Sequence, residues 1–279
     1  MTNVAIIGLG LIGGSFAKAF TALEDTSVFG YDNDEGTIRH ALLIHAMDSR
    51  IDDELLANCD YVFVCLYPEA AEKYIEEKSS IFKKDAVVID CCGTKMRICP
   101  TGFTLAKKHG FNYIGGHPMA GRQQSGLKYS RSDMFKNANM ILVPKKDESL
   151  MLLERVKALL TSIGFGGVTI TTAENHDKII AYTSQLAHVV SNAYVKSPSA
   201  DVHKGFSAGS YKDLTRVARL NPQMWAELFF ENKENITFEI KNIITELQKY
   251  ADALENDDFD SLYSLLKEGS DRKVKLDEK

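Results

Sequence analysis

The sequence predicts an α/β protein with an N-terminal Rossmann-type domain, built on a doubly wound, mostly parallel sheet, and a C-terminal all-helical domain. Two observations support this fold class. Up to about residue 145, short apolar runs alternate with amphipathic segments, as in chains whose strands and helices follow one another in a parallel sheet. From about Glu148 onward, the spacing of the apolar residues is almost entirely helical.

Short apolar runs, each bounded by turn-forming or polar residues, predict the strands of the N-terminal sheet. They are Val4–Ile7, Ser27–Tyr31, Tyr61–Leu66, Ala86–Asp90, Phe111–Ile114 and Met140–Val143. Between several of these runs lie segments with helical spacing, such as Leu11–Phe20 and Glu69–Phe82. The alternation therefore predicts helices on both faces of the sheet.

The second half of the chain predicts helices and at most one further strand. Ser149–Ile163 and Asn175–Lys196 have helical spacing, and Val168–Thr171 could add a strand. Beyond residue 198, almost everything up to Leu266 is helical in pattern.

Two domains follow from this change of pattern. We expect residues 1–165 to form the dinucleotide-binding domain and residues 166–279 to form a helical domain for substrate binding and dimerisation. By analogy with other Rossmann enzymes, the helical domain is expected to form a homodimer. The charged tail, residues 271–279, is expected to be frayed.

Composition excludes several classes of protein. With 44% hydrophobic residues, 25% charged residues and a net charge of −5, the chain is globular, and neither nucleic acid nor an anionic membrane is an expected partner. The chain has no apolar run of about 18 residues and no signal-like N-terminus, so neither a membrane span nor export is expected. The 5 cysteines lack the spacing of paired zinc half-sites, which predicts a cytoplasmic protein with no metal.

The first predicted strand is followed by a glycine-rich motif, Gly8-Leu9-Gly10-Leu11-Ile12-Gly13. Gly8 permits a tight turn, Gly10 lets the backbone approach a pyrophosphate, and Gly13 allows the helix to pack closely on the strand. The phosphates would meet free N–H groups at the start of the helix. Such a motif alone is a weak signal, but its place between strand and helix predicts a dinucleotide site.

Asp32 directly follows the second predicted strand and is suited to accept hydrogen bonds from an adenosine ribose. Its charge would repel a 2′-phosphate, and Asn33 and Asp34 supply no arginine to bind one. NAD is therefore favoured over NADP. The end of the third predicted strand reaches the same edge of the sheet, which adds further expected cofactor contacts: Leu66, Tyr67 and Pro68.

A candidate base follows the fifth predicted strand. His117 lies in the segment Gly115-Gly116-His117-Pro118-Met119-Ala120-Gly121. Ligands of such sheets bind at the carboxyl ends of the strands, so an imidazole here is placed to accept a hydroxyl proton near neutral pH. The alternative is a surface or capping histidine, and the other histidines without such context are interpreted in that way.

Four groups of residues match, in order and spacing, the motifs of a known enzyme family. The first is Gly115–Gly121 with Ser125-Gly126. The second and third are Asp90-Cys91-Cys92-Gly93-Thr94-Lys95 and His176-Asp177 with Ser184-Gln185-Leu186-Ala187-His188. The fourth is Lys212-Asp213-Leu214-Thr215-Arg216, Asn221-Pro222 with Met224-Trp225, and Glu231-Asn232-Lys233. The chain thereby resembles the prephenate and arogenate dehydrogenase family from residue 4 to about residue 235.

The resemblance implies roles for the residues at matching positions. His117 would accept the proton of the ring hydroxyl, and Arg216 would bind a substrate carboxylate. His188 would line the same pocket, Asp213 would orient its neighbours, and Thr94 would supply a catalytic hydroxyl. Further expected substrate contacts are Ser184, Gln185 and Gln123.

The chain departs from the family pattern in the substrate half of the site. Gly93 stands where the family has a serine, which leaves Thr94 as the candidate for that hydroxyl. Gln185 and Ala187 replace a histidine and a proline, and Gln123 stands where relatives are often acidic. Glutamine can form hydrogen bonds but cannot titrate. The resemblance therefore supports the cofactor more strongly than the substrate.

The activity implied by the resemblance is the NAD-dependent oxidative decarboxylation of prephenate to 4-hydroxyphenylpyruvate, in tyrosine biosynthesis. A hydride would pass to the nicotinamide while His117 removes the hydroxyl proton, and loss of CO2 would then make the ring aromatic. The expected ligands are thus NAD and a small-molecule substrate, prephenate or arogenate.

Three alternatives stay open at this point. The first is an arogenate dehydrogenase of the same fold. The second is a β-hydroxyacid or 6-phosphogluconate-type dehydrogenase, a class that relies on a lysine in its helical domain. The third is a non-catalytic NAD-binding protein, which the presence of both His117 and Arg216 argues against.

Overall fold

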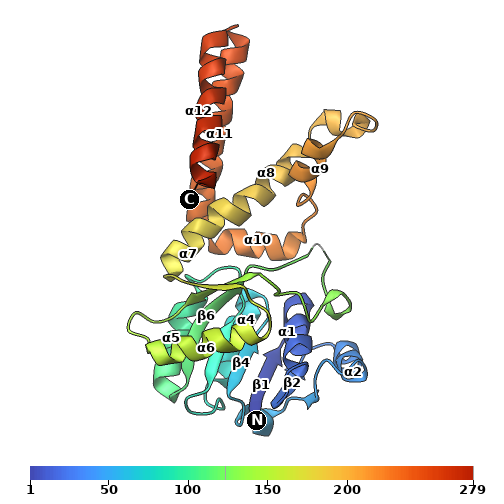
Figure 1. The fold of residues 1–279 in the computed structure, drawn as a ribbon, viewed down its shortest axis with the longest axis vertical. Coiled ribbons are helices and arrows are strands. Elements are labelled where there is room, and N and C mark those ends of the chain that lie inside the picture. Colours follow the sequence, from blue (N-terminus) through green and yellow to red (C-terminus); the bar gives the residue numbers. More distant parts are fainter. Residues whose placement is uncertain (123, 279) are drawn as a thin grey trace.

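The computed structural model describes residues 1–122 and 124–278, which form an α/β domain and a helical domain stacked end to end (Figure 1). The α/β domain is coloured blue to green and occupies the lower part of the view. The helical domain, coloured yellow to red, rises from its upper edge.

One sheet forms the centre of the α/β domain. Its strands are β1 (Thr2–Ile7), β2 (Thr26–Tyr31), β3 (Ser49–Arg50), β4 (Tyr61–Val64), β5 (Val87–Asp90), β6 (Asn112–Pro118), β7 (Asn139–Val143) and β8 (Gly167–Ile170). The spatial order is β3-β2-β1-β4-β5-β6-β7-β8. Only the β6–β7 pairing is antiparallel among the described pairs, which confirms the mostly parallel sheet.

Helices cover both faces of this sheet. They are α1 (Leu11–Thr21), α2 (Glu35–Leu43), α3 (Asp53–Leu56), α4 (Pro68–Lys78), α5 (Ile98–His109) and α6 (Leu150–Ser162). Successive residues of β1 point to opposite faces, so Val4 and Ile6 pack with α1, α2 and α6, whereas Ala5 and Ile7 pack with α3, α4 and α5. The two apolar layers explain why β1 is apolar at every one of these positions, and they confirm the doubly wound arrangement.

The helical domain begins with one long helix that contains a π-helical turn. This helix comprises α7 (Ala173–Ile180), the π turn (Ala181–Gln185) and α8 (Leu186–Tyr194). The later helices are α9 (Gly209–Thr215), α10 (Pro222–Glu231), α11 (Lys233–Glu255) and α12 (Phe259–Asp277), with a short 3-10 turn at Pro198–Val202. A second 3-10 turn, Leu127–Tyr129, belongs to the α/β domain. Figure 1 shows α10 lying across the top of the α/β domain and α11 and α12 projecting away from it as a pair.

The structure extends the sheet beyond the expected domain boundary at residues 165 and 166. The strand β8 pairs with β7, from Asn139 opposite Gly167 to Leu142 opposite Ile170. We therefore propose that the domains divide between Ile170 and Ala173, where the sheet ends and α7 begins.

The expectation of a frayed tail is wrong for residues 271–277, because α12 continues to Asp277. Ion pairs between residues four positions apart support this exposed helix: Lys267 pairs with Asp271 and Lys273 with Asp277. Apolar side chains stay exposed along α11 and α12, at Phe238, Ile244, Leu247, Leu254, Phe259, Tyr263, Leu266, Val274 and Leu276. Among the described helices, none combines the length and the apolar character that a membrane span requires.

Replacing Phe16 by alanine is expected to lower the free energy of unfolding by about 3–5 kcal/mol, because the cavity forms within a cluster of aromatic rings. The Phe16 ring centroid lies 4.2 Å from that of Phe135 and 4.7 Å from that of Phe63, and the side chain is fully buried. Urea-induced unfolding followed by circular dichroism measures the loss. The matched control is Leu43→Ala, since Leu43 is 79% exposed and its truncation should change stability by no more than about 0.5 kcal/mol. Similar losses in both variants would contradict this description of the core.

Candidate active site

The glycine motif after β1 forms the tight turn that the sequence predicts. Gly8 has φ +90°, and a Cβ atom there would lie 2.5 Å from the carbonyl oxygen of Cys65. A Cβ atom on Gly13 would lie 1.8 Å from the carbonyl oxygen of Gly8. By contrast, a Cβ atom on Gly10 would have no heavy atom within 4 Å. The turn therefore requires glycine at Gly8 and Gly13 and is open at Gly10, which fits the approach of a dinucleotide pyrophosphate.

Asp32 lies against this turn at the end of β2. Its Oδ2 accepts a hydrogen bond of 2.8 Å from the backbone N–H of Leu9, and its Oδ1 accepts one of 3.0 Å from that of Asp34. The carboxylate keeps further lone pairs for a ribose hydroxyl. Helix α1 starts directly after Gly10, and no side chain caps its start, so its first backbone N–H groups are available to a phosphate.

The residues after β4 reach the same edge of the sheet, because β4 is the neighbour of β1. A Cβ atom on Gly8 would lie 2.8 Å from the Leu66 side chain, so Leu66 borders the turn directly. Tyr67 is the N-cap of α4 and Pro68 is its first residue. Asp32 and Leu66 thus lie against the glycine turn, and Tyr67 and Pro68 directly follow Leu66 in the chain.

His117 lies at the end of β6 and is joined to the helical domain by a hydrogen bond. Its Nδ1 is 2.9 Å from Nε2 of His176 in α7. The Nδ1 of His176 is in turn 2.6 Å from Oδ1 of the neighbouring Asp177. The Asp177 carboxylate also accepts backbone N–H bonds of 2.8 Å from Lys95 and 3.0 Å from Met96, in the segment after β5. His117, His176 and Asp177 thus form one hydrogen-bonded chain across the domain boundary.

A buried ion pair supports the strand ends beside this chain. The Lys95 ammonium donates to Asp90, and neither side chain is exposed. Asp90 also accepts from the Tyr113 hydroxyl at 2.6 Å, the Cys92 N–H at 2.9 Å and the Gly116 N–H at 3.3 Å. Each of the two buried charges therefore has a hydrogen-bond partner of opposite charge, as their desolvation requires.

The surroundings of His117 favour its neutral form. Burial, the neighbouring His176 and the charge of Lys95 lower the pKa of His117 well below its usual value. Burial also lowers the pKa of His176, although Asp177 opposes that shift. Burial alone would lower the pKa of Lys95, but the Asp90 carboxylate raises it overall. Both histidines are thus neutral and Lys95 is charged at neutral pH.

A second group of predicted residues lies within the helical domain. The His188 ring in α8 packs against Trp225 of α10 in a tilted arrangement, with ring centroids 4.0 Å apart, and its Nδ1 is 2.8 Å from the Ser184 carbonyl oxygen. Burial and the nearby charge of Arg216 lower the pKa of His188, so Arg216, at the end of α9, lies on the His188 side of this domain. Asp213 is on α9 and is exposed.

Two predicted residues make contacts with the end of the α10 segment, Gln185 from within the helical domain and Thr94 from the α/β domain. The buried Gln185 donates to the Leu228 carbonyl at 3.3 Å and accepts from the Asn232 amide at 2.8 Å. The Thr94 hydroxyl donates to Glu231, the last residue of α10. The observed contacts of Gln185 and Thr94 are therefore structural ones between packed elements.

Four further residues complete the site, although the sequence analysis gave them no separate roles: His176, Asp177, Glu231 and Asn232. Their positions in the family motifs indicated that they matter, but not what they contact, because their partners lie far away in the sequence. Gln123, predicted to contact substrate, lies outside the described residues. That His117 and Arg216 face one substrate stays a prediction.

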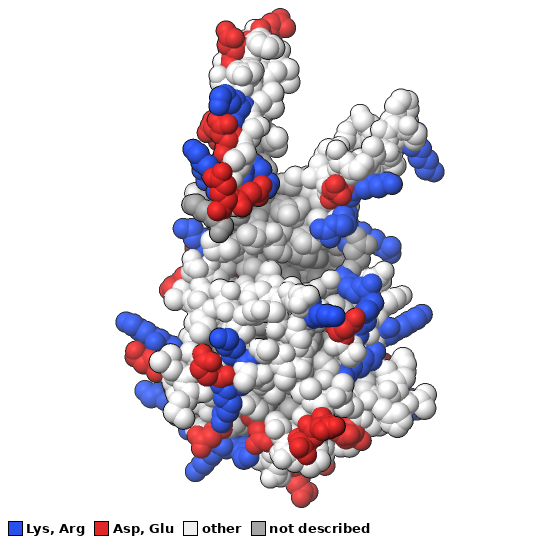
Figure 2. Space-filling view, viewed as in Figure 1, with Lys and Arg blue, Asp and Glu red and all other residues white. Residues whose placement is uncertain are grey.

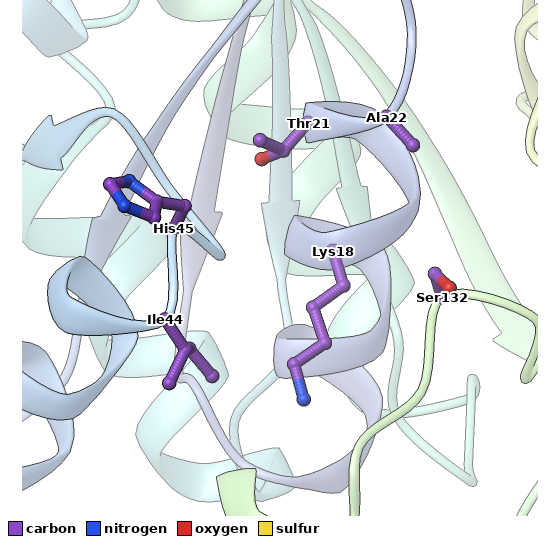
Figure 3. Close-up of a pocket in the computed structure, with 6 residues that line it drawn as sticks. All are labelled: Lys18, Thr21, Ala22, Ile44, His45 and Ser132. Atoms are coloured by element: carbon purple, nitrogen blue, oxygen red, sulfur yellow. The ribbon is translucent and has the colours of Figure 1, made fainter.

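A shallow pocket elsewhere on the α/β domain is separate from this site (Figure 3). It lies at the C-terminal end of α1, opposite to the glycine turn, and is lined by Lys18, Thr21, Ala22, Ile44, His45 and Ser132. The Lys18 ammonium donates to the Ser130 carbonyl at 2.9 Å. The pocket contains none of the predicted site residues.

Charge is unevenly distributed over the surface in Figure 2. Lys and Arg side chains gather on the flank where the top of the α/β domain faces the arm formed by α8 and α9. Asp and Glu side chains gather at the lower end of the α/β domain. Because the net charge is −5, an anionic substrate needs such a local basic region.

Comparison with known proteins agrees with both domains. Residues 16–169 match the family model of the prephenate dehydrogenase nucleotide-binding domain, and residues 172–268 match that of the prephenate dehydrogenase dimerization domain. A cyclohexadienyl dehydrogenase of Zymomonas mobilis is 28% identical over 98% of this chain and 96% of its own length. A prephenate dehydrogenase of Bacillus subtilis is 27% identical over 96% of this chain and 74% of its own length.

The fold is also shared with a solved structure. Prephenate dehydrogenase from Aquifex aeolicus, in complex with hydroxyphenyl propionate and NAD+, superposes with a TM-score of 0.84 and 28% identity, over 99% of this chain and 98% of that one. Because the nucleotide-binding and dimerization models match consecutive segments of this chain, and together span most of it, the chain belongs to the prephenate dehydrogenase family.

Proposed function

We propose that this chain is an NAD-dependent prephenate dehydrogenase of tyrosine biosynthesis, which converts prephenate to 4-hydroxyphenylpyruvate by oxidative decarboxylation. Its family membership and the relatives that carry this name support the reaction. The observation that carries the proposal is the position of His117 at the carboxyl end of β6, with Nδ1 used by His176 and Nε2 left for a substrate hydroxyl.

His117 acts as the base in this mechanism. NAD, when bound, supplies a hydride acceptor. His117 Nε2 accepts the proton of the ring hydroxyl as the hydride leaves the same carbon, and the O–H electron pair forms the carbonyl. The carboxylate on the ring then leaves as CO2, its electron pair makes the ring aromatic, and His117 returns the proton to the phenolate oxygen. The low pKa of His117 keeps Nε2 able to accept at neutral pH.

The substrate anion is held from the helical domain. The planar guanidinium of Arg216 is suited to a two-point bond with a carboxylate, and His188 and Trp225 provide a neighbouring ring surface. Because His188 Nδ1 is engaged with the Ser184 carbonyl, its Nε2 accepts hydrogen bonds. Asp213 orients these groups.

NAD is bound by the glycine turn and by the residues that surround it. Gly8, Gly10 and Gly13 shape the pyrophosphate site, and the start of α1 supplies N–H groups. Asp32 accepts from the ribose and repels a 2′-phosphate. Leu66 borders the turn, and Tyr67 and Pro68, which follow it at the start of α4, add contacts to NAD.

Arogenate is a second candidate substrate. The Zymomonas mobilis relative carries the name cyclohexadienyl dehydrogenase, which describes the ring that prephenate and arogenate share. The name of the Bacillus subtilis relative and of the complex from Aquifex aeolicus favours prephenate.

The protein acts as a homodimer in the cytoplasm. The exposed apolar side chains of α11 and α12 form a face that a second copy can cover, and this segment lies within the match to a dimerization domain. The cysteines are all free, as suits a reducing compartment.

The wild-type protein is expected to form NADH fastest when it is given prephenate and NAD. Parallel absorbance assays should compare prephenate with arogenate and NAD with NADP. Arogenate should react more slowly, and NADP should be a poor acceptor because Asp32 repels its extra phosphate. NAD binding without NADH formation from either substrate would contradict the proposed function.

Replacing His117 by asparagine is expected to lower kcat by about a hundredfold to ten-thousandfold, because the base is lost. The affinity for NAD, measured by calorimetry, should stay nearly unchanged, because His117 acts on the substrate hydroxyl. A parallel loss of NAD binding would place His117 in a different role.

Replacing Arg216 by alanine is expected to raise the KM for prephenate about a hundredfold, as for the loss of a charge-assisted hydrogen bond. The matched control is Arg219→Ala, because Arg219 is an exposed arginine three positions further along the chain and should leave KM unchanged. Steady-state kinetics measure both variants. If the two arginines behave alike, Arg216 does not bind the substrate.

A further inference from the structure

The hydrogen bonds around Asp177 determine where its protons lie. Oδ1 accepts the backbone N–H of Lys95, and Oδ2 accepts that of Met96. A backbone N–H can only donate, so both oxygens of this buried side chain act as acceptors, an arrangement that favours the ionised carboxylate, which has no hydrogen to donate. The third bond to this carboxylate, from His176 Nδ1 at 2.6 Å, must therefore carry its hydrogen on the histidine.

This bond fixes the tautomer of His176. The ring is buried and neutral, and with a hydrogen on Nδ1 it has a lone pair on Nε2. Nε2 of His176 lies 2.9 Å from Nδ1 of His117, so it accepts a hydrogen from that nitrogen. His117 then carries its hydrogen on Nδ1 and has its lone pair on Nε2.

We propose that His176 and Asp177 are positioning residues that hold His117 in the one neutral tautomer whose Nε2 accepts the substrate hydroxyl proton. This inference rests on the proposed function of His117 as the base. Without the hydrogen bonds from Asp177 and His176, the neutral imidazole of His117 could carry its hydrogen on Nε2. That nitrogen would then donate to the substrate hydroxyl instead of accepting from it.

The same hydrogen bonds stabilise the protonated base during the reaction. When the hydroxyl O–H bond breaks and the Nε2–H bond forms, His117 becomes a cation. Its Nδ1–H donates to His176, whose own Nδ1–H donates to the Asp177 carboxylate. The other nearby charge, on Lys95, is already paired with Asp90. Because the phenolate later takes the proton back, His117 ends the cycle in its starting tautomer and no proton is released to solvent.

NMR spectra of the substrate-free protein, with histidine labelled in its ring nitrogens, test the tautomer directly. The His117 signals are identified by their absence from His117→Asn. The expected result is a protonated Nδ1 and an unprotonated Nε2 on His117. A hydrogen on Nε2 of His117 in the wild-type protein would overturn the proposal.

Two substitutions of His176 test its effect on the reaction. His176→Leu removes the acceptor for His117 Nδ1 and is expected to lower kcat about a hundredfold, with little change in the KM for prephenate or in NAD affinity. His176→Gln keeps an amide oxygen that can accept from His117 and an amide N–H that can donate to Asp177. It is expected to retain kcat within about tenfold of wild type and the same His117 tautomer.

The outcomes separate this proposal from the function on which it rests. If wild-type protein forms no NADH from prephenate, the proposed function fails, yet the NMR spectra still report the tautomer. If wild type is active and His176→Leu matches its kcat, the positioning role is refuted. If His176→Gln loses as much as His176→Leu although circular dichroism shows both folded, a simple acceptor role for residue 176 is also refuted. Asp177 is left unchanged, because it also holds the backbone at Lys95 and Met96.

Discussion

The buried carboxylate of Asp177 is the contact on which the arrangement of the two domains depends. It belongs to α7, yet it accepts backbone N–H groups from Lys95 and Met96, which follow β5 in the sheet. A buried charge is stable only where donors surround it, so the carboxylate fixes the start of the helical domain against the carboxyl end of the sheet. His176 is carried into contact with His117 by the same placement.

Lys95 links this carboxylate to a second one. Its backbone N–H binds Asp177, while its ammonium binds Asp90, itself also bonded to Tyr113. Removal of one partner from such a buried set leaves an uncompensated charge, which costs more than the pair contributes to stability. The strand ends that present His117 are therefore held by a polar core beneath a mostly apolar sheet.

Local rules allowed much of the fold to be predicted. The turn around Gly8 depends on backbone sterics, and the buried strands are apolar whichever face they point to, so both are visible in the sequence. The strand β8 was uncertain because it is short and its residues Thr169 and Ile170 are exposed. On the cofactor side of the site, the glycine turn is local, and Asp32 and Leu66 follow from the rule that parallel strands end at one edge of the sheet. The bond between His117 and His176 joins residues 59 positions apart, and no spacing pattern indicates such a contact.

The π-helical turn at Ala181–Gln185 changes which way the long helix presents its side chains. His188 follows His176 by twelve positions, which in a regular α-helix, at about 100° per residue, would leave the two rings about 120° apart around the axis. A π turn accommodates one additional residue, which reduces this angle to about 20°. One continuous rod thus directs one histidine to the base and the other to the aromatic surface of α10, and any rotation of that rod alters both orientations together.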